Sequence, residues 1–419
     1  MNKLIKKVIN LGARNYQIDS RLVNEKDLFF ALKGARTDGH LYLRAIAKEK
    51  ALAAVINKDY YVPQDIDIEL IRVDNVLSFL QNVATEALKK SRAKKIGITG
   101  SFAKTTTKEF IATLLNGKFK VSKTYKNYNS QAGFPIAILN IDKDVDFLVL
   151  EMGMEEKGEI AKLVNIAPLD IALITQLLPY HNIFENIDDL SDAKKEIFSN
   201  QDTKIKLINK KISHLKAFSD DRYLTFSTDD EMADFYLDIE NQIFYEFGKK
   251  VEFKLPFNET HFLENLSSAV AVCRLCEMSY DDIFEGFKSL KAFDLRFEKV
   301  YINDVLFIKD CYNANPISTI AALKNIPKTK GKKIAVLGSN LGLGKYSKED
   351  HLKIYKVAKE NVDEILCYGN EWEEIDNILL FSDHESLAKH LNQIMKKDDV
   401  VLIKGSRSME LEKIFNFIN

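Results

Sequence analysis

Short apolar runs alternate along the chain with longer stretches in which apolar residues recur every three or four positions. The runs 95–99, 145–151 and 171–175 are rich in aliphatic and β-branched residues, which predicts buried strands. The stretch 104–115 follows the first run directly and gathers its apolar residues on one side of a helix. Strands that alternate with helices in this way predict an α/β fold with mostly parallel sheets.

The same pattern divides the chain into three segments. Residues 1–92 predict a small α/β domain, and the basic segment 89–95 follows as a linker. Residues 93–299 predict a central domain with a mostly parallel sheet of the P-loop type and helices on both faces. Residues 300–419 predict a Rossmann-like α/β domain. Three domains suit 419 residues, because single cores rarely grow beyond about 250–300 residues.

The composition is that of an ordinary soluble globular protein. Apolar residues make up 46% of the chain and the formal net charge is −1, so no global basic field favours nucleic acid or an anionic membrane. The four cysteines do not suggest a disulfide framework, and Cys273 and Cys276 are expected in a buried helix. No apolar stretch is long enough for a signal peptide or a membrane span, which predicts a cytoplasmic protein.

One strand–loop–helix stretch has the architecture of a phosphate cradle. The small-residue loop 100–103 follows a strand, and Lys104 and Thr105 open the next helix. Loop N–H groups bind an anion in such a cradle, the lysine reaches the β- and γ-phosphates, and the threonine hydroxyl holds magnesium. The strict pattern needs glycine where this chain has Ile98 and Ala103, so an ordinary strand-to-helix turn is the alternative. A positive φ at residue 103 would make alanine cost about 1 kcal/mol relative to glycine.

Two further polar residues follow strands that belong to the same predicted sheet. Glu151 ends the strand 145–151, and His181 follows the strand 171–175. Carboxyl ends of parallel strands meet at one edge, where ligands of such sheets bind, so both side chains are expected near the loop 100–103. A lone strand-end glutamate is usually solvated and a lone histidine is usually structural. The three features together nevertheless predict a magnesium-nucleotide site.

Other segments carry weaker signals. An amphipathic helix is predicted to begin at Asp192, another helix presents His261 and Asn265 on one face, and Ser318 is expected to cap a helix over 319–325. Three residues after the last strand are expected to hold a carboxylate or phosphate at the N-terminus of a following helix. They are Lys404, Ser406 and Arg407.

These motifs resemble those of the Mur ligases, the ATP-dependent amino-acid ligases of peptidoglycan synthesis. The resemblance covers nearly the whole chain and keeps the order of the family's motifs. The matching segments are 19–21, 33–40, 98–109, 151–160, 310–316 and 404–409. The segments 151–160 and 310–316 are similar to those of the branch that acts on a UDP-muramoyl-tripeptide.

The resemblance implies a reaction and its partners. ATP phosphorylates the terminal carboxylate of UDP-N-acetylmuramoyl-tripeptide, and the amine of D-alanyl-D-alanine then displaces phosphate through a tetrahedral intermediate. Two Mg²⁺ ions are expected to neutralise the crowded oxygens. By resemblance, residues 1–92 bind the UDP-substrate, 93–299 bind ATP, and 300–419 form the ligase domain. A monomer without a nucleic-acid partner is expected.

The resemblance also implies roles for individual positions. Catalytic roles fall to Lys104, Glu151, His181 and Lys194. Thr105 and Glu151 are expected to hold one magnesium ion and His181 the second, helped by a carbamate on Lys194, for which a plain surface lysine is the alternative. The positions expected to contact ATP are Gly100, Ser101, Phe102, Ala103, Lys104, Thr105, Thr106, Asn265, Arg296, Asp310, Tyr312 and Asn313. The positions expected to contact the other substrates are Ser20, Arg21, Lys33, Asp38, Gly39, His40, Asn127, Asn129, Asn315, Lys404, Ser406 and Arg407.

Several departures from the family's pattern fall near the expected nucleotide and metal. They are Ala103, the run 176–180, the segment 129–133, and Ser339 after a Leu-Gly turn. Two alternatives to an active ligase of this branch follow. One is a sister ATP-dependent amide ligase, of the folate or cyanophycin type. The other is a catalytically weak nucleotide-binding protein that acts as a scaffold.

Overall fold

The structure is a computed structural model, and its described part forms two compact units. The described residues are 2–34, 37–125, 128–177, 184, 186–219, 223–252, 254–257, 260–290 and 295–418, with only the backbone of 260 and 261. The first unit lies within 1–178, 187–254 and 265–289, and the second within 179–186, 255–264 and 290–419. None of the helices in this described part combines the length and apolarity that a membrane crossing requires.

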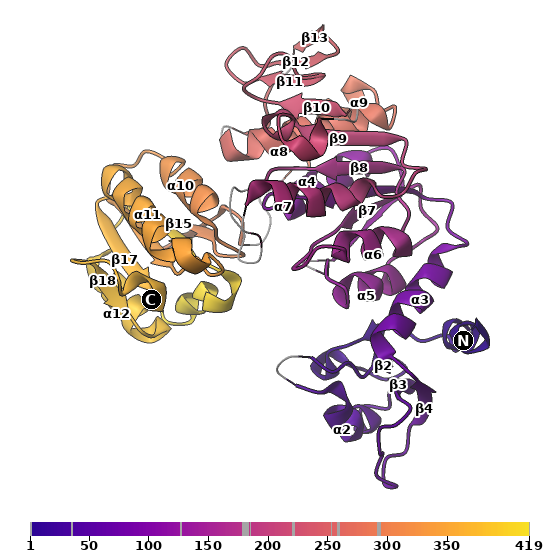
Figure 1. The fold of residues 1–419 in the computed structure, drawn as a ribbon. Helices are drawn as coiled ribbons and strands as arrows, with labels where there is room; N and C mark the ends of the chain where they lie inside the picture. Colours follow the sequence, from indigo (N-terminus) through magenta and orange to yellow (C-terminus); the bar gives the residue numbers. More distant parts are fainter. Residues whose placement is uncertain are drawn as a thin grey trace. The chain divides into compact units, whose positions relative to one another are not determined.

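A four-stranded parallel sheet forms the N-terminal part of the first unit (Figure 1). Its order is β1 (Tyr16–Gln17), β2 (Leu28–Phe30), β3 (Ala53–Asn57) and β4 (Glu69–Val73). The helices of this part are α1 (Asn2–Asn10), α2 (Leu43–Lys48) and α3 (Val76–Leu88), with the short 3-10 helices η1 (Ser20–Leu22) and η2 (Gly39–Tyr42). Because side chains alternate along a strand, Leu28 and Phe30 pack toward α1 and α3, whereas Phe29 packs toward α2.

The central sheet of the first unit has nine strands in the order β13-β12-β11-β10-β9-β8-β5-β7-β6. The strands are β5 (Lys94–Thr99), β6 (Val121–Lys123), β7 (Phe147–Glu151), β8 (Ile171–Ile174), β9 (Ile205–Asn209), β10 (Leu224–Ser227), β11 (Phe235–Asp238), β12 (Ile243–Glu246) and β13 (Lys249–Glu252). The seven strands from β6 to β11 in this order pair in parallel, whereas the pairs β11–β12 and β12–β13 are antiparallel. The prediction of a mostly parallel sheet is therefore confirmed.

Helices cover both faces of this sheet, as the alternating pattern predicts. They are α4 (Lys104–Leu115), α5 (Gly133–Asn140), α6 (Glu159–Ile166), α7 (Ile187–Lys195), α8 (Thr260–Leu275) and α9 (Tyr280–Phe287), with η3 (Glu196–Phe198), η4 (Lys210–Ile212) and η5 (Lys216–Phe218). Leu148 and Leu150 of β7 join the cluster formed with α5 and α6. Val149 and Glu151 point to the opposite face, where α4 packs on β7.

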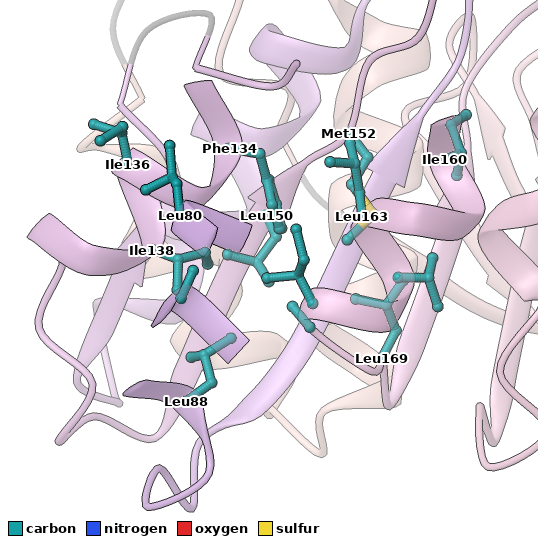
Figure 2. Packing of buried hydrophobic residues seen from close by; sticks show 14 of the residues in the cluster. Leu80, Leu88, Phe134, Ile136, Ile138, Leu150, Met152, Ile160, Leu163 and Leu169 are labelled. Atoms are coloured by element: carbon teal, nitrogen blue, oxygen red, sulfur yellow. The ribbon is translucent and has the colours of Figure 1, made fainter. Parts of the chain in front are cut away.

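Helix α3 links the two sheets of the first unit through one continuous hydrophobic cluster (Figure 2). Leu80 and Leu88 of α3 lie in this cluster with Phe134 of α5, Leu150 of β7 and Leu163 of α6. All five side chains are at most 5% exposed. Replacing a leucine of this kind by alanine typically costs about 2–5 kcal/mol, so the cluster fixes the frame on which the strand ends are placed.

The second unit contains a six-stranded sheet in the order β14-β15-β19-β16-β17-β18. The strands are β14 (Glu298–Ile302), β15 (Val305–Asp310), β16 (Lys333–Gly338), β17 (Glu364–Tyr368), β18 (Leu379–Phe381) and β19 (Val400–Lys404). The helices are α10 (Pro316–Lys324), α11 (Ser347–Asn361) and α12 (His384–Ile394), with η6 (Gly344–Tyr346), η7 (Asn370–Trp372), η8 (Arg407–Met409) and η9 (Leu411–Asn416). Helices α10 and α11 pack on one face, and α12 with η9 on the other.

Three local predictions are wrong. Asn315 caps α10, and Ser318 is instead the reciprocal partner in a capping box, because Pro316 opens the helix earlier than expected. Asp192 lies late in α7, which begins at Ile187. The chain after β19 enters the short 3-10 helices η8 and η9 instead of the expected α-helix.

Candidate active site

The end of β8 holds the loop between β5 and α4 in place. The Ser101 N–H group donates to the Gln176 carbonyl at 2.7 Å, and Thr175 Oγ1 donates to the Phe102 carbonyl at 2.7 Å. A Cβ on Gly100 would lie 2.0 Å from Thr175 Oγ1, so the loop needs glycine there. The loop therefore lies at the carboxyl edge of the sheet, with a shape that a neighbouring strand determines.

Ala103 begins α4 in the left-handed region of backbone conformation, with φ of 66° and ψ of −8°. Its side chain makes no capping hydrogen bond. Alanine in this conformation costs about 1 kcal/mol more than glycine, because its Cβ crowds the following carbonyl. Residue 103 therefore has the positive φ at which alanine is strained, and the loop carries this strain.

Changing Ala103 to glycine is expected to raise the free energy of unfolding by about 0.5–1 kcal/mol, because it removes this strain. Chemical denaturation measures the change. Ala112→Gly in the same helix is the matched control, and it should lose about 1 kcal/mol, since glycine is a poor helix former. A loss of stability in both variants would contradict the strained conformation.

Lys104 folds back over the loop. Its Nζ donates to the Gly100 carbonyl at 2.8 Å and to the Ser101 carbonyl at 3.4 Å. The first N–H groups of α4 have no partners within the helix and carry the positive end of its dipole. A lysine ammonium and a helix N-terminus at one loop fit a polyphosphate, and the Thr105 hydroxyl at this terminus fits its magnesium ion.

Glu151 lies beside this loop, because β7 pairs with β5 and places Glu151 opposite Ile98. Its Oε1 accepts a hydrogen bond from Asn129 Nδ2 at 2.7 Å. Its Oε2 is buried and has no hydrogen-bond partner in the described part of the chain. Oxygen donors of this kind are the ligands that Mg²⁺ prefers, so Glu151 fits a magnesium ligand, and Asn129 positions it.

Lys194 lies in the last turn of α7 and is only 3% exposed, so the alternative of a plain surface lysine is wrong. Burial lowers the pKa of the Lys194 ammonium well below its usual range, and the charge of Lys104 lowers it further. Glu196 and Glu159 offset part of this shift. A lysine amine that is neutral near pH 7 can react with carbon dioxide, which a charged ammonium cannot do.

Glu196 is a supporting residue that sequence reasoning missed. Its carboxylate accepts hydrogen bonds from the Gly158 N–H at 2.6 Å and the Ala161 N–H at 3.2 Å, so it caps α6 from outside. Glu159 accepts bonds from the N–H groups of residues 155 and 156. These contacts fix the segment that follows Glu151. The sequence signal for Glu196 was its acidic side chain two positions after Lys194. Its partner Gly158 lies 38 residues away, so the contact was not predictable.

The candidates of the N-terminal sheet divide into exposed and internal groups. Arg21 and Lys33 are exposed cations, and Arg21 forms a bidentate pair with Asp19 at 2.6 and 2.9 Å. Ser20 lies beside Arg21 in η1. Exposed cations of this kind suit an anionic ligand, whose binding here stays a prediction.

Asp38, Gly39 and His40 fasten the loop that they belong to. His40 is buried, its Nδ1 lies 2.6 Å from Asp38 Oδ1, and its Nε2 accepts from the Asn57 N–H group at 3.0 Å. The ring stacks on Tyr60 with centroids 4.4 Å apart. A Cβ on Gly39 would lie 2.9 Å from the backbone of residue 32. Because both ring nitrogens of His40 are occupied, this geometry favours a supporting role for His40.

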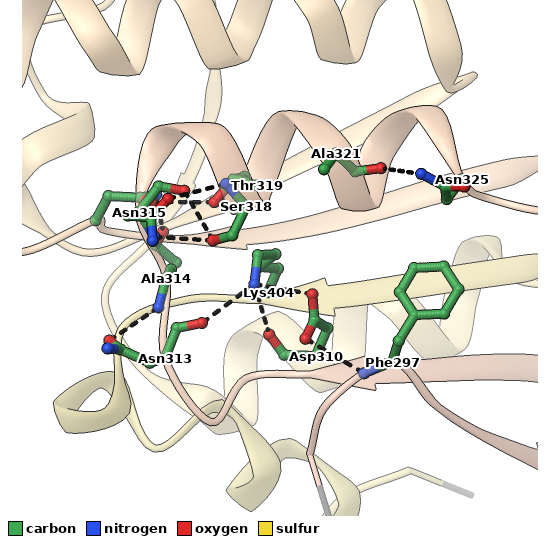
Figure 3. A network of polar contacts seen from close by, with 12 residues as sticks. Phe297, Asp310, Asn313, Ala314, Asn315, Ser318, Thr319, Ala321, Asn325 and Lys404 are labelled. Carbon is green, nitrogen blue, oxygen red and sulfur yellow. Dashed lines mark hydrogen bonds and ion pairs between the residues drawn. The ribbon is translucent and has the colours of Figure 1, made fainter. Parts of the chain in front are cut away.

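Lys404 is the centre of a polar network in the second unit (Figure 3). Its buried Nζ lies 2.8 Å from Asp310 Oδ2 and donates to the Asn313 carbonyl at 3.1 Å. Asp310 Oδ1 accepts from the Phe297 N–H at 3.2 Å. The network joins β15 and β19 and holds the turn that ends in Asn315. Lys404 therefore has an internal structural role at the carboxyl ends of these strands.

The remaining candidates are Arg296, Tyr312, Ser406 and Arg407 of the second unit and Asn265 of the first unit. The Arg296 guanidinium stacks on Tyr312 at 4.3 Å from the ring centroid. Arg407 pairs with Glu412, and Ser406 Oγ accepts from the Leu341 N–H at 2.8 Å. Asn265 of α8 is buried. His181 and Asn127 lie outside the described residues.

His351 holds the loop that carries Leu341. Its Nε2 accepts from the Asn340 N–H at 3.0 Å, and its Nδ1 donates to the Ser347 carbonyl at 2.7 Å. Burial lowers the pKa of His351, since the charged ring would lose its hydration. Sequence reasoning missed this residue, because nothing local distinguishes a buried histidine.

The pH dependence of stability follows from the pKa of His351. The unfolded imidazole protonates near its usual pKa of about 6.5, and the folded one only at lower pH, so the protein loses stability as the pH falls from about 6.5 to the folded pKa. The lost free energy is about 1.4 kcal/mol per pH unit in this range. Denaturation of His351→Gln should show less acid destabilisation than the parent. His214→Gln, at an exposed turn position, is the control.

Four described candidates come together at the central sheet, whereas the candidates of the N-terminal sheet and of the second unit belong to other elements. Lys104, Thr105, Glu151 and Lys194 all belong to elements at the carboxyl edge of the central sheet. The departure at Gln176 leaves the loop contact intact, because the contact uses its main-chain carbonyl. This edge can bind a magnesium polyphosphate and hold a modified lysine beside it.

Two family models match the chain: the Mur ligase middle domain at residues 98–273 and the Mur ligase glutamate ligase domain at residues 295–407. The UDP-N-acetylmuramoyl-tripeptide–D-alanyl-D-alanine ligase of Bacillus subtilis is 31% identical over 418 residues, which cover 94% of this chain and 91% of the relative. The ligase of that name from Rickettsia prowazekii is 28% identical over 97% of this chain and 96% of its own.

Solved structures agree with these matches. The MurF ligase from Thermotoga maritima in complex with ADP superposes with a TM-score of 0.80, 30% identity and 97% coverage of both chains. MurF from Acinetobacter baumannii has a TM-score of 0.83 at 23% identity, and covers 99% of this chain and 97% of its own. The second likeness concerns the fold, which is thus shared along nearly the whole chain.

Proposed function

This chain belongs to the Mur ligase family, and we propose that it adds D-alanyl-D-alanine to UDP-N-acetylmuramoyl-tripeptide at the expense of ATP. One observation carries the proposal. The cradle lysine, a buried carboxylate with one oxygen that accepts no hydrogen bond, and a buried lysine of lowered pKa lie at one edge of the central sheet. The named relatives support the choice of substrates, since they match over more than nine tenths of both chains.

The reaction joins a carboxylate to an amine in two steps. The carboxylate at the end of the tripeptide attacks the γ-phosphorus of ATP, and ADP leaves. The amine of D-alanyl-D-alanine then attacks the acyl carbon, loses a proton, and expels inorganic phosphate. Lys104 is expected to lie against the transferring phosphoryl group, where its charge stabilises the oxygens in the transition state. The loop that positions it is fastened to β8 by Thr175.

Magnesium supplies charge neutralisation between the phosphate oxygens and the acceptor carboxylate when it is bound. Thr105 and Glu151 are proposed to hold one ion. Asn129 orients Glu151 by donating to its Oε1, whereas Oε2 accepts no hydrogen bond in the described part of the chain. His181 and a carbamate on Lys194 are proposed for the second ion.

The carbamate forms when the neutral amine of Lys194 attacks carbon dioxide and releases one proton. The low pKa of Lys194 supports this step, because burial and Lys104 both disfavour the charged form. The product is an anionic oxygen donor that replaces a buried amine. The new charge would lie near Lys104, whose ammonium would then be attracted to it and not repelled.

We also propose the division of labour that the sequence predicts. Residues 1–92 bind the UDP-substrate, 93–299 bind ATP, and 300–419 present D-alanyl-D-alanine. Arg21 and Lys33 support the first assignment as exposed cations on one small sheet domain. The strand-end network of Lys404 and Asp310 supports the third, because it holds the polar turn in one conformation. A cytoplasmic monomer is proposed as the working form.

Phosphate release from ATP tests the function. Purified protein with Mg²⁺ would receive UDP-N-acetylmuramoyl-tripeptide and D-alanyl-D-alanine together, and each alone. Release that requires both, with a pentapeptide product by mass spectrometry, is expected. Single amino acids in place of the dipeptide are the control for a sister amide ligase, and tripeptides with diaminopimelate or lysine identify the third residue. ADP binding without any release would favour the scaffold.

A further inference from the structure

A second lysine of α4 is buried without being part of the site described so far. Lys108 follows Lys104 by one helical turn, and its side chain has a relative exposure of 0%. Core positions of a helix rarely hold lysine, because burial of an unpaired ammonium is costly. The position therefore needs partners that compensate for the charge.

Two carboxylates and a carbonyl surround the Lys108 ammonium. Nζ donates to the Thr124 carbonyl at 2.8 Å, and lies 3.3 Å from Glu109 Oε1 and 3.6 Å from Glu151 Oε2. Glu109 has a second ammonium partner in Lys123. Among the described residues, only Lys108 places an ammonium group within ion-pair distance of Glu151.

The separation of 3.6 Å allows attraction without a hydrogen bond. Glu151 Oε2 thus stays without a hydrogen-bond donor although a positive charge lies beside it. Thr124 holds both groups in this relation, since its carbonyl anchors the Lys108 ammonium and its Oγ1 accepts from the Glu151 N–H at 3.0 Å. The arrangement neutralises the carboxylate and keeps its lone pairs available.

We propose that Lys108 is a positioning residue that serves as the resident counter-ion of Glu151 and weakens its hold on a divalent cation. The inference rests on the proposed role of Glu151 as a magnesium ligand. A buried carboxylate that loses its cationic partner destabilises the fold, so the Lys108 ammonium holds Glu151 in place when no metal is bound. The same positive charge opposes the metal ion, which favours release after each turnover.

The sign of the metal effect distinguishes this role from simple packing. Lys108→Met removes the ammonium and keeps most of the side-chain volume. The dissociation constant of Mn²⁺, added alone to the purified full-length protein, is expected to fall on the order of tenfold, because a charge a few ångströms from the ion is removed. Electron paramagnetic resonance of free Mn²⁺ measures it. A packing defect would leave the affinity unchanged or weaken it.

Lys123→Met is the matched control. It removes the other ammonium of Glu109 from a position where the Lys123 side chain is 40% exposed, and no contact with Glu151 is lost. Its Mn²⁺ dissociation constant should equal that of the parent. An equal shift in both variants, an unchanged or raised constant in Lys108→Met, or no Mn²⁺ binding to parent and variant would each overturn the proposal.

A double-mutant cycle without metal tests the ion pair separately from catalysis. Melting temperatures in EDTA are compared for the parent, Lys108→Met, Glu151→Gln and the double variant. The loss caused by Lys108→Met should shrink to less than half in the Glu151→Gln background. If Lys108→Met does not fold, recovery of folding in the double variant supports the ion pair. If neither Lys108→Met nor the double variant folds, the proposal is overturned. A ligase assay that fails while the cycle shows coupling would count against the proposed function alone.

Discussion

Replacing Lys194 by methionine is expected to lower ligase turnover by a factor on the order of 10³, which is the scale for losing one preorganised electrostatic group or metal ligand. The protein should fold and be at least as stable as the parent. Lys194 is 3% exposed and its pKa is lowered mainly by burial, so its amine contributes no favourable charge to the folded state. Methionine keeps the apolar stem and removes the group that is costly to bury.

Phosphate release and chemical denaturation together test this expectation. Lys195→Met, at the half-buried next position of the same helix turn, is the matched control. It should change turnover by less than about threefold, because the Lys194 amine is kept. Protein exposed to ¹³C-labelled bicarbonate should show a carbamate signal by NMR that is lost in Lys194→Met. A variant that keeps a tenth or more of the parent turnover would contradict the proposed carbamate.

The period of the hydrophobic pattern made two features predictable: the fold, and the edge of the central sheet at which the candidate site lies. The strands that end in Thr99 and Glu151 were evident from their apolar runs, and the parallel arrangement then placed both ends at one edge. This inference needs only local sequence and one rule of sheet architecture. It correctly placed the loop 100–103 and the carboxylate of Glu151 side by side.

Burial and backbone strain were not predictable in the same way, because they depend on contacts between distant segments. The neighbouring residues Lys195 and Glu196 are typical of a solvated helix face, and they suggested an exposed Lys194. Helix α7 instead packs so that the Lys194 side chain is buried. His40 was expected to contact substrate, but its ring nitrogens are bound by Asp38 and by Asn57, which lies 17 residues later. Ser318 and Asn315 both suit an N-cap by type, and the position of Pro316 decided between them.

The loop lysine leads to the second large effect. Lys104→Met is expected to lower turnover by a factor on the order of 10³ and to weaken ADP binding about tenfold or more, because the ammonium that lies over the loop is expected to contact the phosphates. Calorimetry measures ADP affinity and phosphate release measures turnover. Lys118→Met, at an exposed position beyond the end of α4, is the control and should change neither. Full ADP affinity in Lys104→Met would mean that the loop is an ordinary turn.

Lys104→Met should also raise the pKa of Lys194. The loss of a phosphate contact alone would not have this effect. The positive charge of Lys104 contributes to the lowered pKa of Lys194, so its removal lets that pKa rise. A higher pKa leaves less neutral amine at a given pH, and the carbamate then forms less readily. The ¹³C carbamate signal should therefore disappear at a higher pH in Lys104→Met than in the parent. Equal pH limits in the two proteins would show that the two lysines are not coupled, and that Lys104 acts on the phosphates alone.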